Sequence, residues 1–184
     1  VPLAGKLADR TDFYDRPGGY KEHHRPTPYL GGMAVIFGFL VSSIIFADAL
    51  ADFRVPALCV LILLVVGTID DRVNLGIGAR LVVEVGVAVG VWAAGQGWQL
   101  GAGEMLDLLV TIGWVVGLIN AYNLMDNLDG ATATVAGTSA AGIGALALVQ
   151  GDPMLGATCF ALVGACLGFL PHNLARPSRM FLGD

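Results

Sequence analysis

The sequence carries little charge for its length. Only 14% of its 184 residues are Asp, Glu, Lys or Arg, whereas 55% are hydrophobic, and the mean hydropathy is +0.72. A soluble globular domain has about 25% charged residues and roughly 45–50% apolar ones. The low charge therefore argues against a soluble domain, and the thinly spread net charge of −5 indicates no nucleic-acid-binding surface.

Cysteine is scarce as well. Its three copies, Cys59, Cys159 and Cys166, all lie within apolar stretches. A disulfide framework needs an oxidising compartment, and a cysteine metal or redox site needs a spacing such as Cys-x-x-Cys, which this sequence lacks. We therefore expect three free thiols packed among apolar side chains. A secretory signal is also absent, and the first membrane span can serve as the insertion signal.

What the sequence has in abundance is long apolar runs. A helix of about 20 apolar residues crosses the roughly 30 Å hydrocarbon core of a bilayer. Six runs approach this length, so we predict an all-α, polytopic transmembrane helix bundle that forms a single membrane domain over residues 1–184. The six predicted spans are residues 30–50, 55–69, 79–94, 105–122, 131–150 and 153–171.

The basic residues predict how these spans are oriented. Six alternating spans place four polar segments on one side of the membrane, namely residues 1–29, 70–78, 123–130 and 172–184. Of the ten Lys and Arg residues, all but Arg54 belong to these segments or border them. The positive-inside rule therefore puts the four segments in the cytoplasm. Because the chain starts at Val1 and stops at Asp184, just after an apolar-to-polar transition, we interpret it as a fragment of a longer protein.

Glycine is frequent, with 26 copies, and three pairs have Gly-xxx-Gly spacing within the predicted spans. These pairs are Gly86 and Gly90, Gly113 and Gly117, and Gly164 and Gly168. Such spacing lets helix backbones approach closely. We therefore expect close helix packing at these pairs rather than a hinge or a pore.

Two adjacent acids, Asp70 and Asp71, follow the second predicted span. Adjacent carboxylates repel each other, so the pair favours a cation, and hard oxygen ligands suit Mg²⁺. A helix-end cap or interfacial charge is an equally good explanation for this pair taken alone.

A second polar cluster ends the fourth predicted span. Asn120 and Asn123 are three residues apart, as are Asp126 and Asp129, so each pair shares a face if the segment is helical. These side chains could bind a metal ion or the edge of a nucleobase. Helix capping and turn formation are the alternative explanation.

Two further segments complete the set of cytoplasmic motifs. The basic, proline-rich residues 15–28 include Lys21 and His23, whose cations suit either a phosphate or an anionic lipid. At the other end of the chain, Gly183 lets the backbone before Asp184 approach a ligand closely, although a plain turn also explains it. Because all four clusters fall on the same predicted face, we predict a site for an anion and a metal ion there.

In this order, the four clusters resemble the motifs of the polyprenyl-phosphate N-acetylhexosamine-1-phosphate transferases. The matching residues are Asp15-x-Pro17-x-x-x-Lys21-x-His23-x-x-Pro26-x-Pro28-x-x-Gly31-Gly32, then Asp70-Asp71-Arg72 with Leu75 and Arg80-Leu81 downstream, then Asn120-x-x-Asn123-x-x-Asp126-x-x-Asp129-Gly130, and finally Asn173 with Phe181-Leu182-Gly183-Asp184. The resemblance covers nearly the whole chain. Departures from the family pattern, none of which affects the acids of the motifs, occur at Tyr20, Asn127, Ala131 and Glu84.

The resemblance implies a multi-pass enzyme of the cell membrane that acts at its cytoplasmic face in cell-envelope glycan synthesis, such as that of lipopolysaccharide or teichoic acid. Such an enzyme transfers an N-acetylhexosamine 1-phosphate from a UDP-sugar to undecaprenyl or another polyprenyl phosphate and releases UMP. It uses Mg²⁺, with Mn²⁺ as the alternative ion. The implied partners are both substrates and the lipid bilayer, without nucleic acid, and a homodimer is left open.

The first motif, with Lys21 and His23, resembles the branch that uses UDP-GlcNAc, and the phospho-MurNAc-pentapeptide transferases are the alternative. We expect a His-rich motif that helps to separate these donors to lie after Asp184.

The resemblance also implies roles for individual residues. Asp70 and Asp71 are the implied catalytic residues, which position or deprotonate the lipid phosphate, and Asn123 and Asp184 are the implied Mg²⁺ ligands. The implied substrate-binding residues are Lys21, His23, Arg80, Asn120, Asp126, Asp129 and Asn173. Direct attack by the lipid phosphate and a covalent aspartyl intermediate are both compatible with these roles.

Two rival classes share some of these features. The CDP-alcohol phosphatidyltransferases use Asp-x-x-Asp-Gly-x-x-Ala-Arg, but this chain has Thr134 where the Arg belongs and no later acid through Val149. A transporter or channel, the non-enzymatic alternative, usually holds its ion site near the middle of the membrane. The acids of this chain are predicted to lie at one interface instead.

Overall fold

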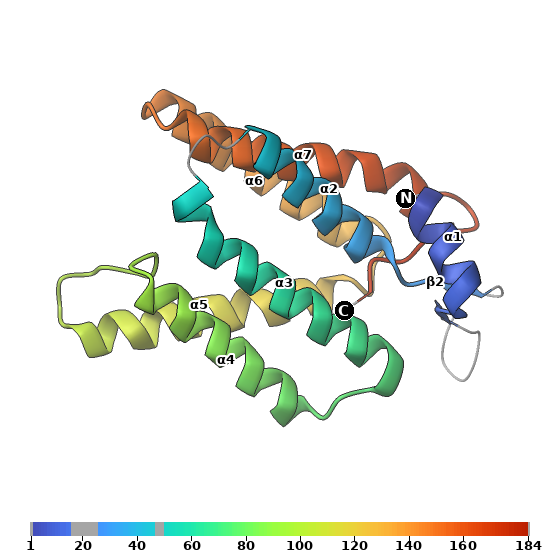
Figure 1. The fold of residues 1–184 in the computed structure, drawn as a ribbon, viewed down its shortest axis with the longest axis horizontal. Coiled ribbons are helices and arrows are strands. Elements are labelled where there is room, and N and C mark those ends of the chain that lie inside the picture. The colour runs from blue at the N-terminus through green and yellow to red at the C-terminus, as the bar shows by residue number, and fades with distance from the viewer. Residues whose placement is uncertain (1, 16–25, 47–49, 184) are drawn as a thin grey trace. The chain divides into compact units, whose positions relative to one another are not determined.

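The chain folds into α-helices joined by short connections (Figure 1). The computed structural model describes residues 2–15, 26–46 and 50–183. Its helices are α1 (Pro2–Thr11), α2 (Gly31–Phe46), α3 (Leu50–Val73), α4 (Ile77–Ala93), α5 (Glu104–Met125), α6 (Ala131–Val149) and α7 (Pro153–Asn173). Two strands of two residues each, β1 (Tyr14–Asp15) and β2 (Thr27–Pro28), pair antiparallel. The predicted all-helical class is confirmed apart from this short pairing.

Each predicted membrane span overlaps one helix, from α2 to α7. Four of the described helices are long and apolar enough to cross a bilayer, namely α5, α6, α7 and residues Phe53–Val73 of α3. The apolar helix α2 has 16 residues and α4 has 17, both fewer than the roughly 20 that a span requires. The helices thus support a membrane protein, and the count of six spans stays a prediction.

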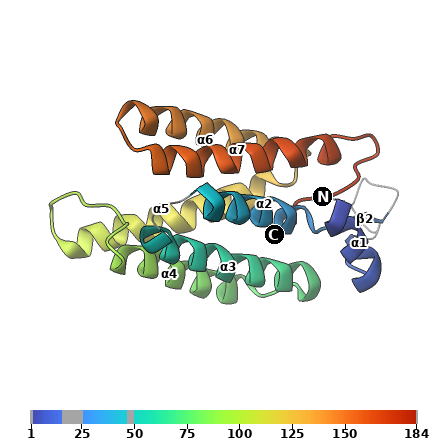
Figure 2. The ribbon, with the colours of Figure 1, turned by 45° about the horizontal axis from the view of Figure 1, so that its top comes forward.

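Residues 1–49 and 126–184 form one compact unit. Within it, α7 packs against both α2 and α6, and Figure 2 shows α6 and α7 side by side. Its main core cluster joins α6, α7 and the segment that follows α7, and consists of Ala133, Cys166, Phe169 and Met180. A smaller cluster of Ala8, Phe13 and Leu30 fixes α1 against the start of α2.

Small residues let α6 and α7 approach each other closely. The buried or half-buried residues Ala133, Gly137, Ala140, Gly144 and Ala147 recur every three or four positions along α6 and therefore share one face. A Cβ placed at Gly144 would lie 3.0 Å from the Cβ of Cys159 on α7.

The predicted Gly-xxx-Gly pairs are not contact points of this kind. In the part of the chain that the structure describes, no neighbouring side chain or other segment lies within 4 Å of a Cβ placed at any of the six glycines. The prediction of close packing at these pairs was therefore wrong here, because the spacing identifies a possible contact face but not the partner that would cover it.

Residues 50–125 form the second compact unit. In it, α4 packs against both α3 and α5. Because consecutive helices run in opposite directions, the C-terminal end of α3, the start of α4 and the C-terminal end of α5 lie at one end of this unit (Figure 1). Since two compact units are present, the predicted single membrane domain stays a prediction.

Candidate functional site

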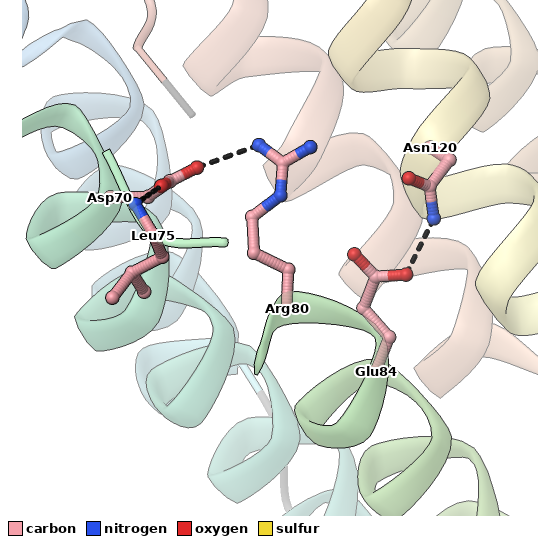
Figure 3. Close-up of polar contacts among 5 residues, drawn as sticks. All are labelled: Asp70, Leu75, Arg80, Glu84 and Asn120. Carbon is pink, nitrogen blue, oxygen red and sulfur yellow. Dashed lines mark hydrogen bonds and ion pairs between the residues drawn. The ribbon is translucent and has the colours of Figure 1, made fainter. Parts of the chain in front are cut away.

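The corner between α3 and α4 is built around Asp70. This residue lies in the last turn of α3 and is only 4% exposed. Its Oδ1 accepts a hydrogen bond of 2.5 Å from the backbone N–H of Leu75, and its Oδ2 pairs with Nη1 of Arg80 at 2.6 Å (Figure 3). Asn74 lets the chain turn here, because Asn adopts its φ of 50° more readily than most residues. Two predicted site residues, Asp70 and Arg80, are therefore in direct contact.

The burial of Asp70 explains why Arg80 is needed. A buried charge is stable only when it is paired and hydrogen-bonded, and removing one partner of a buried pair costs roughly 3–5 kcal/mol. The side chain of Arg80 is 26% exposed, whereas that of Asp70 is 5% exposed. Asp70 is therefore the more deeply buried partner of this pair.

A second polar pair joins α4 to α5. The carboxylate of Glu84, a residue that is 6% exposed, accepts a hydrogen bond of 2.5 Å at Oε2 from Nδ2 of Asn120 (Figure 3). The same Nδ2 also donates to the backbone carbonyl of Val116 at 2.9 Å. Asn120 was predicted as a site residue, but Glu84 was assigned no role. An acid two turns inside an apolar helix was the signal that could have identified it.

The remaining predicted residues of this unit lie close to these two pairs along the chain. Asp71 follows Asp70 in α3 and is half-buried. Asn123 lies on α5, about one turn after Asn120, and is also half-buried. Both asparagines are helical, because α5 continues to Met125 instead of ending at Tyr122 as predicted.

In the other unit, the first and fourth motifs are joined by backbone hydrogen bonds. The N–H of Phe181 donates to the carbonyl of Pro28 at 2.9 Å, and its carbonyl accepts from the N–H of Gly31 at 3.0 Å. The N–H of Gly32 donates to the carbonyl of Leu182 at 2.7 Å. A Cβ at Gly31 would clash with the backbone oxygen of Phe181 and would lie 2.5 Å from a ring carbon of Phe169 on α7, so the close contact of the two segments requires glycine there.

Asn173, at the end of α7, links the third motif to the fourth. It is 5% exposed, and its Oδ1 accepts a hydrogen bond of 2.5 Å from the N–H of Gly130. Its Nδ2 donates to the carbonyl of Met180 at 3.0 Å. Gly130 has a φ of 76°, a left-handed conformation that glycine adopts without strain, and it turns the chain from Asp129 into α6. Asn173 therefore positions both segments, and its contact with a substrate stays a prediction.

The two acids of the third motif lie in the turn that precedes α6. Asp126 is half-buried and Asp129 is exposed. Three other predicted site residues, Lys21, His23 and Asp184, lie outside the described residues.

The predicted Mg²⁺ ligands are Asn123 and Asp184. Among the described residues, no three His, Cys, Asp or Glu side chains lie close enough together to hold a metal ion. The chemistry of the predicted pair nevertheless fits Mg²⁺, because an amide oxygen and a carboxylate are hard oxygen donors.

Tyr14 lies one residue before the first motif, outside the predicted spans. Its hydroxyl donates a hydrogen bond to Oδ1 of Asp9. This hydrogen bond raises the pKa of Tyr14 above its ordinary value of 10.0, and desolvation and the nearby negative charges of Asp9 and Asp12 act in the same direction.

Comparison with known proteins matches the chain to a family model. The model described as "Glycosyl transferase family 4" matches residues 53–184. Over all of its length, the chain is 27% identical to the "Probable undecaprenyl-phosphate N-acetylglucosaminyl 1-phosphate transferase" of Bacillus subtilis and covers 54% of that protein. Over 99% of its length, it is 29% and 28% identical to the proteins named "Undecaprenyl-phosphate alpha-N-acetylglucosaminyl 1-phosphate transferase" of Yersinia pestis and Escherichia coli K12, of which it covers 53%.

The chain thus spans about half the length of the curated relatives that it matches. No solved structure matches it.

Proposed function

Since the chain belongs to glycosyl transferase family 4, we propose that its protein transfers GlcNAc 1-phosphate from UDP-GlcNAc to undecaprenyl phosphate and releases UMP. The names of its relatives support both the acceptor and the sugar, because they specify undecaprenyl phosphate and N-acetylglucosaminyl 1-phosphate transfer. The predicted UDP-GlcNAc branch agrees with these names.

The observation that carries this proposal is the contact between Asp70 and Arg80 at the corner of α3 and α4. A guanidinium is suited to phosphate, because its planar N–H groups match two phosphate oxygens at once. A buried carboxylate that fixes the guanidinium reduces the entropy lost when phosphate binds. We therefore assign Arg80 to a phosphate of the substrates and Asp70 to holding Arg80 in place.

In the proposed reaction, an oxygen of undecaprenyl phosphate attacks the phosphorus that carries the sugar. The bond between this phosphorus and the bridging oxygen breaks, and UMP leaves with that oxygen and its electron pair. The product is a lipid diphosphate that carries GlcNAc. Asp71 positions the attacking phosphate and accepts its proton if it carries one. Asp126 and Asp129 help to seat the nucleotide, and Lys21 and His23 contact the phosphates.

Mg²⁺ is the proposed cofactor, and Asn123 and Asp184 are the residues that would hold it. When bound, the ion stabilises negative charge on the diphosphate and on the departing UMP. The positive charge of Arg80 contributes to the same stabilisation from the protein itself.

We further propose that α2 to α7 all cross the membrane and that their motif-bearing ends face the cytoplasm. The distribution of Lys and Arg supports this orientation, because all but Arg54 lie at or near those ends. The shorter helices α2 and α4 can cross where the bilayer is locally thinned.

The test uses membranes that carry the full-length protein, undecaprenyl phosphate and either UDP-GlcNAc or UDP-MurNAc-pentapeptide. We expect UMP release with UDP-GlcNAc but not with UDP-MurNAc-pentapeptide, and only in the presence of Mg²⁺ or Mn²⁺. Asp70→Asn should lose most of the activity, because the neutral amide no longer holds Arg80 by charge. Asp152→Asn is the matched control, because Asp152 caps α7 through the N–H of Leu155 and Asn caps helices equally well. Full activity of Asp70→Asn would contradict the assignment of Asp70.

A further inference from the structure

We propose that Glu84 is a positioning residue that fixes the amide of Asn120 so that its carbonyl oxygen, and not its NH₂ group, is offered to the substrate or its cation. This inference rests on the proposed function and deepens it, because it specifies that Asn120 contacts the substrate or its cation as a hydrogen-bond or metal acceptor and not as a donor.

The hydrogen bonds of Asn120 define this polarity. A side-chain amide has two N–H donors on nitrogen and two acceptor positions on oxygen. Nδ2 of Asn120 donates to Oε2 of Glu84 at 2.5 Å and to the carbonyl of Val116 at 2.9 Å. Both partners are acceptors, so they take up the two N–H groups. The opposite orientation of the amide, with Oδ1 facing these two oxygens, is therefore excluded. Oδ1 is left as the group that Asn120 can offer, and Figure 3 shows it turned away from Glu84.

The position of Glu84 argues that it is more than a packing residue. It lies seven residues after Ile77, inside an apolar helix, and it is buried together with Val87 and Ala88. A charged side chain at the centre of a membrane helix costs about 2.5–3.5 kcal/mol on insertion scales. A leucine would fill a similar volume without this cost. What a carboxylate adds is a group that accepts and cannot donate when ionised.

A hydrogen bond that only fastens α4 to α5 is the simpler explanation, since polar side chains often join membrane helices. Such a fastening would work equally well with donor and acceptor exchanged. The proposed role adds one requirement, because the side chain at position 120 must also offer an acceptor to the site. The partner of Oδ1 is therefore electron-poor, either an N–H group of the nucleobase or the divalent cation.

A reciprocal exchange in the full-length protein tests whether an oxygen at position 120 is the group that the site needs. In N120D, two carboxylates meet, and we expect kcat/KM to fall by about 10- to 100-fold. E84Q keeps an acceptor for the amide, so we expect it to lose less kcat/KM than E84L, which keeps none. In N120D/E84Q, the introduced glutamine donates to the introduced aspartate, which still offers an oxygen to the site. We expect this double variant to recover at least about tenfold over N120D.

Thermal stability in detergent is measured alongside the kinetics for every variant. A double variant that is as stable as E84Q but no more active than N120D would overturn the proposal. Recovery of activity together with stability supports the need for an acceptor at position 120.

Two binding measurements identify the partner of Oδ1. Calorimetry with UMP in the absence of divalent metal reports on the nucleobase, and electron paramagnetic resonance of Mn²⁺ without nucleotide reports on the cation. Weaker binding of UMP or of Mn²⁺ by E84L at unchanged thermal stability supports the role and assigns the partner. Unchanged binding of both, or weaker binding only together with lower thermal stability, would overturn it. These measurements need no turnover, so they can test Glu84 even if the wild type releases no UMP and the proposed function fails.

Discussion

Truncating Asn173 should loosen the connection between the third and fourth motifs. In N173A, the N–H of Gly130 and the carbonyl of Met180 both lose their partner. Both residues are buried, Met180 at 2% exposure, so water cannot readily replace the amide. Each unsatisfied buried group costs about 1–3 kcal/mol, which gives at least about 2 kcal/mol for the two.

This cost should appear as easier opening of the segment after α7. A loss of 2 kcal/mol raises the open fraction roughly 30-fold, because about 1.4 kcal/mol corresponds to a factor of ten. Cleavage by trypsin after Arg179 can measure this open fraction. Arg179 is exposed, and the segment that follows it is held by Asn173 and by the start of α2. When opening is fast relative to cleavage, the cleavage rate follows the open population.

The assay compares cleavage at Arg179 in full-length protein purified in detergent. N173A should be cleaved roughly 30-fold faster than the wild type. N173D should fall between them, because its carboxylate can accept from Gly130 but cannot donate to Met180. Gln150→Ala is the matched control, an amide truncated at an exposed position. Equal cleavage rates in N173A and Q150A would refute the linking role of Asn173.

Two further predictions concern the region around the first motif. Gly31→Ala places a Cβ 2.5 Å from the ring of Phe169 and should destabilise the protein by about 1–3 kcal/mol in thermal unfolding, whereas Gly168→Ala, which meets nothing within 4 Å among the described residues, should not. Tyr14 should ionise above pH 10, and its contribution to stability should be complete below pH 10 and lost as pH rises through the raised pKa. The difference in tyrosinate absorbance between wild type and Y14F measures this pKa, and D9N should lower it; an unchanged value in D9N would contradict the role of Asp9.

The helices could be predicted because the length of an apolar run is a local property of the sequence. Their ends were less predictable wherever tertiary contacts stabilise polar residues within a helix. The second span was expected to end at Ile69 because two acids follow it, yet α3 continues to Val73. The contacts of Asp70 with Leu75 and Arg80 explain this, because they stabilise the acid in the last turn.

The short helix α1 was not expected because it is far too short to span a membrane. Its only local signal was the spacing of small apolar residues such as Ala4 and Ala8, four positions apart, which pack toward Phe13 and Leu30.

The motifs could be predicted as a set, but the partners within them could not. Asn173 binds Gly130 across 43 positions, and Asn120 binds Glu84 across 36. Spacing along one chain segment contains no information about such pairs, because they form only after two helices pack together. The same limit explains why the two protein contacts of Asn173, one at each end of its amide, were not predicted.

The most direct test of the proposed transfer is to measure both of its products in one reaction. Membranes with the full-length protein, UDP-GlcNAc labelled in the sugar, undecaprenyl phosphate and Mg²⁺ should yield UMP and lipid-linked GlcNAc in equal amounts, and neither product should form without the lipid phosphate. UMP without a lipid-linked sugar, or lipid-linked sugar with release of UDP instead of UMP, would contradict the transfer of a sugar phosphate by this protein.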